Sequence, residues 1–274
     1  MITVQAATDP ARPDRPNEDW HGHRTNPSSL VAAVLDGVGS SGDGCVHGTP
    51  WYVNQLGAAL LETASSSHRP LADALRDAIT EVNCRHPWCS TDAPTAPAAA
   101  VGLVRVCRDQ LEWCVLADVT VAITTAERTL QICDNRVDDV VPTATSRLGQ
   151  HPLGTAEHRA TAEQIVAEQL PHRNQPRGYW VAQADTHAAD QAHVGSLPTS
   201  DFAEVLIATD GAMRRADWGL TTPGRILTRA SNDGPDSVLR AQRAAEHDDP
   251  YGTRHPRFKD RDDATCLVVT RENA

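Results

Sequence analysis

The sequence lacks an excess of positive charge, a long hydrophobic run and a leader-like start. It carries 25 Lys and Arg residues against 36 Asp and Glu residues, a net charge of −11, whereas a nucleic-acid-binding face needs the opposite balance. No apolar run approaches the ~20 residues that span a bilayer. Residues 1–5 also lack the charged and apolar regions of a signal peptide. We therefore expect a cytoplasmic protein that binds neither nucleic acid nor membrane.

Cysteine occurs in an odd number and in a scattered arrangement. There are seven cysteines, several of them inside apolar runs, which favours reduced thiols packed as small hydrophobic side chains. One cluster, Cys84, His86 and Cys89, offers three zinc ligands. No fourth ligand is apparent, and the spacing matches no common zinc module. We expect an inert loop here, with a zinc site as the alternative.

The hydrophobic pattern predicts a mixed α+β protein. The length of 274 residues and a hydrophobic content of 40% suit a single domain over residues 1–274. Apolar side chains at helical spacing predict helices that lie on a sheet at 51–65 and 71–82. Short apolar runs between turn-like breaks predict an antiparallel meander at 100–107, 111–116, 119–125 and 129–133. Further strands are predicted at 2–7, 179–182, 202–209 and 266–270.

Carboxylates stand beside several of these strands. The apolar run Val31–Leu35 leads directly into Asp36 and Gly37, and a later apolar strand leads in the same way into Asp210. A glycine after the carboxylate lets the backbone turn sharply and approach a ligand closely. The acids at or near such positions are Glu18, Asp19, Asp36, Asp118, Asp210 and Asp262.

These carboxylates would repel one another if they met, and the sequence shows no matching cationic cluster. Divalent ions would relieve the repulsion. Carboxylates, a glycine carbonyl and water are ligands for Mg²⁺ or Mn²⁺ rather than for zinc or copper, and two such ions can act on a phosphoryl group. Each position alone is also typical of an ordinary turn, so spacing leaves open whether the acids meet.

The order of the acidic motifs resembles that of the metal-dependent protein phosphatases of type 2C, closest to their bacterial, actinobacterial branch. The motifs that carry the resemblance are Asn17-Glu18-Asp19, Asp36-Gly37-Val38-Gly39, Ala117-Asp118, Thr209-Asp210-Gly211 and Asp262-Asp263-Ala264-Thr265. The resemblance runs from about residue 3 to residue 270. It implies an α-β-β-α sandwich, in which two antiparallel sheets pack together and helices flank both outer faces.

The resemblance also implies a role for each acid. Asp36 would bridge two metal ions, and Gly37 would offer its carbonyl to one of them. Asp210 and Asp262 would hold the second ion, and Asp210 would share a third, weaker ion with Asp118. Glu18 and Asp19 would bind metal-coordinated waters. The implied metal is Mn²⁺ or Mg²⁺.

The chain departs from the family pattern at three informative positions. Val38 replaces the histidine proposed as the general acid in eukaryotic relatives, which leaves the leaving-group acid unassigned. The usual Gly-Asp-Ser motif has become Ala117-Asp118-Val119. The phosphate-binding arginine normally precedes the glutamate by four residues, where this chain has Asp14. Arg15, one place later, is our candidate for that role.

These features imply a metal-dependent phosphatase with Asp36, Asp210 and Arg15 as its catalytic residues. A metal-activated water would hydrolyse phosphate monoesters, with phosphoserine or phosphothreonine on a protein as the favoured substrate. One alternative is a phosphatase that acts on a phosphorylated small molecule or peptide intermediate. Another is a catalytically weak pseudophosphatase that serves as a binding or regulatory module. The sequence leaves the substrate, the partner kinase and the oligomeric state open.

Overall fold

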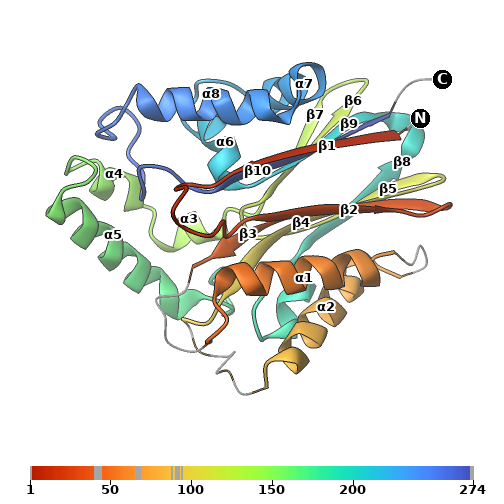
Figure 1. Cartoon of the computed structure of the whole chain (residues 1–274), viewed down its shortest axis with the longest axis horizontal. Coiled ribbons are helices and arrows are strands. Elements are labelled where there is room, and N and C mark those ends of the chain that lie inside the picture. Colours follow the sequence, from red (N-terminus) through yellow and green to blue (C-terminus); the bar gives the residue numbers. More distant parts are fainter. Residues whose placement is uncertain are drawn as a thin grey trace.

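The structure is a computed structural model that describes residues 2–39, 45–65, 69–87, 89, 93 and 95–271. Within these residues, two five-stranded antiparallel sheets pack face to face (Figure 1). The first sheet has, in spatial order, β1 (Ile2–Asp9), β10 (Ala264–Arg271), β9 (Phe202–Ala208), β6 (Thr120–Thr125) and β7 (Thr129–Ile132). The second has β2 (Trp20–Thr25), β3 (Ser29–Val38), β4 (Ala98–Cys107), β5 (Gln110–Leu116) and β8 (His193–Pro198).

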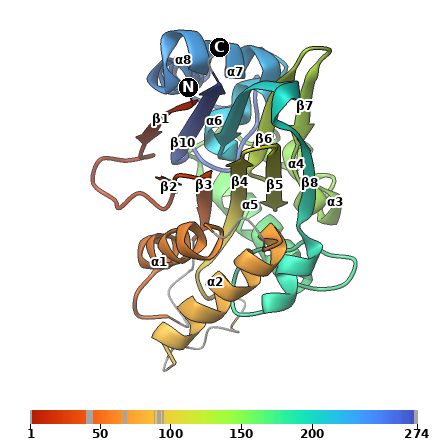
Figure 2. The ribbon, with the colours of Figure 1, turned by 90° about the vertical axis from the view of Figure 1, so that its right-hand side faces the viewer.

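Helices cover the outer face of each sheet, so that the layers alternate as helix, sheet, sheet and helix. Figure 2 shows the second sheet covered by α1 (Thr49–Thr63) and α2 (Leu71–Arg85). The first sheet is covered by α6 (Asp210–Asp217), α7 (Pro223–Asp233) and α8 (Pro235–His247). The shorter α3 (Arg136–Val140) and α4 (Ala144–Leu148) lie with α5 (Ala156–Gln169) beside one end of the sandwich. Short 3-10 turns occur at Leu170–His172, Thr186–Gln191 and Thr199–Asp201.

Three apolar layers hold this arrangement together. The central layer lies between the sheets and is built from alternate residues of β3, β4, β6, β9 and β10, such as Val34, Val104 and Ile207. A second layer joins α1 and α2 to β3 and β4, and a third joins α6, α7 and α8 to β9 and β10. Strands buried on both faces lose the alternation of polar and apolar residues, which is why β3 and β4 read as continuous apolar runs. The predicted α-β-β-α sandwich is confirmed.

The predicted meander is wrong in its connectivity. Its four strands form, but β4 pairs with β5 in the second sheet, whereas β6 pairs with β7 in the first. The chain leaves one sheet for the other just after β5, where Ala117 adopts a left-handed backbone with φ 62°. That conformation is unfavourable for a residue with a Cβ by about 1 kcal/mol, and the sharp change of direction requires it. The crossing places Asp118 at the junction of the two sheets.

The predicted strand at 179–182 is also wrong. Tyr179 and Ala182 each make only an isolated bridge, to Arg173 and Ala99 respectively. Two strands were missed by the sequence reasoning, β2 and β8. Both lie at the edges of the second sheet, and none of their residues is buried, so neither strand carries an apolar run. Among the described helices, none combines the length and hydropathy needed to cross a bilayer.

Candidate metal centre

Strand register brings Asp19 beside Asp36 in the second sheet. Trp20 at the start of β2 pairs with Leu35 in β3, so the next residue outward on each strand is an aspartate. Burial raises the pKa of Asp36 well above its usual value, and the charge of Asp19 raises it further, followed by that of Asp210. The same pKa also responds to the charges of Asp118 and Asp262. The acids predicted from scattered motifs therefore meet in space.

The register of the first sheet supplies the other half of the cluster. Thr120 in β6 pairs with Ala208 in β9, and continuing this pairing by two residues sets Asp118 opposite Asp210. Burial raises the pKa of Asp118 to about 7, and Asp210 is the neighbour that raises it most. On the other side of β9, the Thr209 N–H donates to the Thr265 carbonyl at 3.0 Å. This hydrogen bond brings Asp262, just before β10, to the same end of the sheet as Asp210.

Thr209 connects the two halves. Its hydroxyl donates to Asp19 Oδ2 at 3.0 Å and accepts the Thr265 N–H at 3.0 Å. Asp19 is only 7% exposed, and among the described residues its second oxygen, Oδ1, has no hydrogen-bond partner although it is buried. An orphaned carboxylate oxygen is costly unless a cation or a bound water satisfies it. The donor set here is oxygen only, which fits Mg²⁺ or Mn²⁺.

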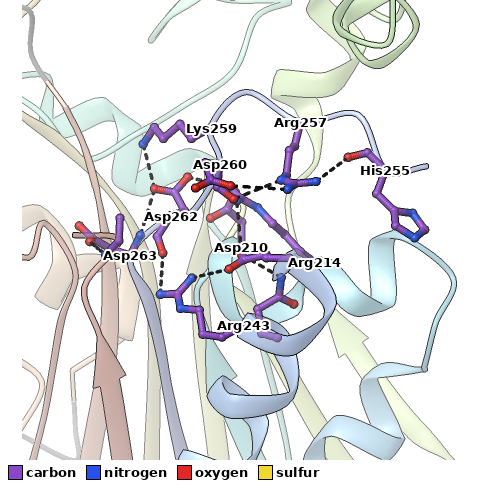
Figure 3. A network of polar contacts seen from close by, with 12 residues as sticks. Asp210, Arg214, Arg243, His255, Arg257, Lys259, Asp260, Asp262 and Asp263 are labelled. Carbon is purple, nitrogen blue, oxygen red and sulfur yellow. Dashed lines mark hydrogen bonds and ion pairs between the residues drawn. The ribbon is translucent and has the colours of Figure 1, made fainter. Parts of the chain in front are cut away.

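Asp262 differs from the other acids because two cationic side chains form ion pairs with it (Figure 3). Lys259 Nζ is 2.8 Å from Oδ1, and Arg214 Nη2 is 2.6 Å from Oδ2. Burial alone would raise the pKa of Asp262, but the charges of Lys259 and Arg214 outweigh it and lower that pKa. The expectation that the acids have no matching cationic cluster is therefore wrong for this part of the site. Lys259 is the only lysine in the chain and stands three residues before Asp262, and Arg214 stands one helical turn after Asp210.

Glu18 and Gly37 meet at a very close backbone approach. A Cβ on Gly37 would lie 2.3 Å from the Glu18 carbonyl oxygen and 2.6 Å from Thr49 Cγ2, so only glycine fits there. The Glu18 N–H donates to Asp263 Oδ2 at 2.7 Å, and the Ala11 N–H donates to Asp263 Oδ1 at 2.7 Å. Asp263 thus anchors the loop between β1 and β2 against β10. Burial raises the pKa of Glu18, against the opposing charge of Lys259.

Arg15 lies in the cleft that opens over these acids. The cleft has a volume of about 920 Å³, and its lining includes Glu18, Asp262, Lys259 and Arg15. Arg15 is exposed. Asp14, at the position where an arginine was expected, is instead held by Arg12 at 2.7 Å. Arg15 therefore shares a cleft with Glu18 and Asp262, and its role in binding phosphate stays a prediction.

Sequence reasoning missed several charged residues of the site. Arg214, Lys259 and Asp263 contact the predicted ligands directly. Asp138 and Asp217 add further negative charge beside Asp210, and the pKa of Asp217 is raised to about 6 by burial and then by the charges of Asp210 and Asp138. Local signals existed for three of them: Arg214 follows Asp210 by four residues, and Lys259 and Asp263 are close to Asp262 in sequence. Asp138 lies on α3 and Asp217 at the end of α6, and no local pattern shows that their charges reach Asp210.

Comparison with known proteins decides the family. The family profile of protein phosphatase 2C matches residues 9–228. The chain belongs to this family. No curated protein sequence gives a significant match. Among solved structures, the chain resembles the serine/threonine phosphatase Stp1 of Staphylococcus aureus at 14% identity and a TM-score of 0.62, over 100% of this chain and 96% of that one.

Two further similar structures are of phosphatases named PstP. The serine/threonine phosphatase PstP/Ppp of Mycobacterium tuberculosis aligns at 14% identity and a TM-score of 0.57, over 99% of both chains. A catalytic domain of PstP solved with two manganese ions aligns at 13% identity and a TM-score of 0.54, over 98% of this chain and 97% of that one. At such identities the likeness shows the fold.

The family match and the structural similarity therefore confirm the predicted family, fold and class of activity. Members of the family are metal-dependent protein phosphatases that use Mn²⁺ or Mg²⁺, in agreement with the predicted cofactor. The alternatives, a small-molecule phosphatase and a pseudophosphatase, are not favoured by these findings. The individual ligand and catalytic assignments stay predictions. Arg15, Glu18 and Asp262 line one cleft, and the pKa of Asp36 responds to the charges of Asp19, Asp118, Asp210 and Asp262.

Proposed function

We propose that this chain removes phosphate from phosphoserine and phosphothreonine side chains of protein substrates in the cytoplasm. One observation carries the proposal: carboxylates from both sheets raise one another's pKa at one end of the sandwich, and among the described residues neither Asp19 nor Asp36 forms an ion pair with a side chain of the protein. The free thiols of all seven cysteines are in keeping with a reducing compartment. Alignment over the whole chain supports one catalytic domain.

The proposed division of labour follows the position of each residue. Asp36 lies between the two halves of the cluster and would bridge two ions, with the Gly37 carbonyl as a further ligand of one. Asp210 and Asp262 would hold the second ion, and Asp118 would share a third with Asp210. Glu18 and Asp19 would accept hydrogen bonds from coordinated waters, a role that suits the unpartnered Asp19 Oδ1.

The chemistry needs both a nucleophile and charge neutralisation. Divalent ions, when bound, lower the pKa of water and withdraw charge from phosphoryl oxygens. The chain's own contribution is orientation. Arg15 and Lys259 line the cleft above the acids and would hold the phosphoryl oxygens of the substrate, with Arg15 free to fork onto two of them. The exposed rim formed by Arg12, Pro13 and Arg15 leaves room for a phosphorylated side chain that projects from a larger protein.

The decisive experiment compares substrates and metals on the purified chain. We expect turnover of a phosphothreonine peptide with Mn²⁺ or Mg²⁺, complete loss in EDTA, and recovery when metal is returned. Asp36→Asn should abolish turnover, whereas Asp109→Asn, in an exposed turn, should keep it. Turnover that persists in excess chelator would contradict the metal mechanism. Metal binding without turnover of any phosphate ester would instead show a binding protein.

A small-molecule phosphatase is separated by the same assay. A protein phosphatase should process phosphopeptides with a higher kcat/KM than p-nitrophenyl phosphate, because residues that flank the phosphate add contacts along the rim. A preference for the small ester, with no gain from any flanking sequence, would contradict a protein substrate.

A further inference from the structure

A second group of potential metal ligands lies at the end of the α1/α2 pair. Cys45 and His47 come just before α1, and His86 and Cys89 come just after α2. One ligand atom from each of the four lies within 4.8 Å of every other. Sequence reasoning expected an inert loop at His86 and Cys89 because it found no fourth ligand. The missing ligands are about forty residues earlier in the chain, and Cys84 is exposed and outside the group.

The distances within this group match a tetrahedral metal site. Cys45 Sγ is 3.5 Å from His47 Nδ1 and 3.7 Å from His86 Nδ1, and Cys89 Sγ is 3.6 Å from His47 Nδ1. Zinc–sulfur bonds of about 2.3 Å and zinc–nitrogen bonds of about 2.0–2.1 Å give a tetrahedral sulfur–nitrogen edge of about 3.6 Å. Hydrogen bonding explains the arrangement less well, since His47 Nδ1 has either one proton or one lone pair in the ring plane and faces two sulfur atoms.

The surroundings hold these side chains in place. The ring of Trp51 stacks on His47 at 4.2 Å and lies 4.9 Å from the ring of His86, and Trp51 itself packs against the apolar layer under the second sheet. His86 is 2% exposed, and burial, together with the nearby His47, lowers its pKa and favours the neutral imidazole that a metal requires.

Backbone N–H groups lie close to the sulfur of Cys45. Burial raises the pKa of this thiol, and the backbone N–H groups of His47 and Gly48 offset only part of that rise. Cys45 lies just ahead of the fifteen-residue helix α1, whose first turn carries no acidic residue, so the positive end of the helix dipole is left for a nearby anion.

We propose that Cys45, His47, His86 and Cys89 bind one Zn²⁺ ion in a closed structural site. Four protein ligands leave no open position for a substrate, so the ion would act as a cross-link. It would tie the segment ahead of α1 to the end of α2. Cys45 and His47 also line the cleft that contains Glu18 and Asp262. The zinc would therefore fix one wall of the substrate cleft, and this proposal stands independently of the catalytic one.

The test measures metal content and ligand type, with activity set aside. The untagged full chain is purified under reducing conditions without chelator, and zinc is counted by inductively coupled plasma mass spectrometry. We expect one zinc per chain. Cys45→Ser and Cys89→Ser should each lower the zinc affinity by at least about tenfold. Cys84→Ser, the matched control at the same helix end, should keep it. Asp36→Asn should keep it too, because the acids form a separate site.

Cobalt substitution keeps the test valid if a cysteine variant fails to fold. Co²⁺ added to zinc-stripped wild-type protein should give the strong visible bands of tetrahedral cobalt and a thiolate-to-cobalt charge-transfer band. The oxygen ligands of the acidic site produce no thiolate band. Absence of zinc and of this band in reduced wild-type protein would overturn the proposal. So would equal zinc loss in Cys84→Ser, or a Cys45–Cys89 disulfide in freshly purified protein, which would mark a redox pair.

Discussion

Arg214 and Asp262 form an ion pair of 2.6 Å within the set of carboxylates assigned to metal. The same guanidinium lies 3.7 Å from Asp210, and its side chain is only 9% exposed. On the other side of the site, Asp19 and Asp36 have no such cation among the described residues. The chain's own cations thus partly neutralise Asp210 and Asp262, whereas Asp19 and Asp36 would depend more strongly on the proposed divalent ions.

Replacing Arg214 should change how strongly metal stabilises the protein. In the metal-free state, Arg214→Met leaves Asp262 and the buried Glu246 less compensated, and loss of one partner of a buried pair costs about 3 kcal/mol. Bound Mn²⁺ would supply the missing charge, so the penalty should shrink. Denaturant unfolding with and without Mn²⁺ measures both effects. Arg240→Met, on the exposed side of α8, is the control for simple charge loss. Equal stabilisation by Mn²⁺ in wild type and Arg214→Met would contradict this account.

Asp36→Asn should separate stability from activity. The raised pKa of Asp36 means that its ionised form is disfavoured in the fold, and asparagine removes this cost because it cannot ionise. We therefore expect the metal-free variant to be at least as stable as the metal-free wild type at pH 7.5. Turnover and stabilisation by Mn²⁺ should both be lost. A clear fall in metal-free stability would show that Asp36 has a structural role instead.

Asp118 should make the metal-free protein lose stability as pH rises. An aspartate in the unfolded chain titrates near pH 4, whereas Asp118 has a pKa of about 7 in the fold. Its protonated form therefore contributes stability that is complete below about pH 4 and is lost as pH rises through 7. Between pH 5.5 and pH 8, the free energy of unfolding should fall less steeply in Asp118→Asn than in wild type.

The same variant tests the proposed third ion. At saturating Mn²⁺, Asp118→Asn should keep two tightly bound ions by calorimetry while turnover falls. Identical pH slopes in EDTA would remove Asp118 from the acidic cluster. Unchanged turnover at limiting Mn²⁺ would remove it from catalysis.

Much of this site was predictable because its acids sit next to strands. A buried strand can be recognised in the sequence as an apolar run. A carboxylate where the run stops lies at the end of that strand, and this pattern identified Asp36 and Asp210. The ordered motifs then identified Asp118 and Asp262. Strand pairing was harder to predict. The pattern of polar and apolar residues in β5 and β6 is the same whether the two strands pair in one sheet or lie in two sheets. The left-handed turn at Ala117 carries no signature when the residue is alanine.

Contacts between distant segments were beyond the sequence. Lys259 reaches Asp262 from an irregular loop, and the direction of its side chain depends on how that loop packs against β10. Cys45 and His47 meet His86 and Cys89 only because α1 and α2 lie side by side with the start of one near the end of the other. No local periodicity encodes that relation. The three ligands visible in one stretch suggested an incomplete site and included Cys84, which lies outside the group.

Gly37→Ala should damage the metal centre without removing any ligand. Its new Cβ would overlap the Glu18 carbonyl oxygen at 2.3 Å, and neither β3 nor the Glu18 segment can yield freely. β3 is paired on both sides, and Asp263 fixes the Glu18 N–H at 2.7 Å. We expect a loss of about 1–3 kcal/mol in unfolding free energy, as for other overpacked sites. Because the strain falls on Glu18 and on the Gly37 carbonyl, Mn²⁺ affinity should drop by at least about tenfold, the usual cost of disturbing the groups around a metal.

Gly154→Ala is a suitable control, since its Cβ would meet nothing within 4 Å, although its positive φ adds a backbone penalty. If Gly37→Ala bound Mn²⁺ as tightly as wild type, the close approach would be incidental, and the Gly37 carbonyl would have no part in holding metal.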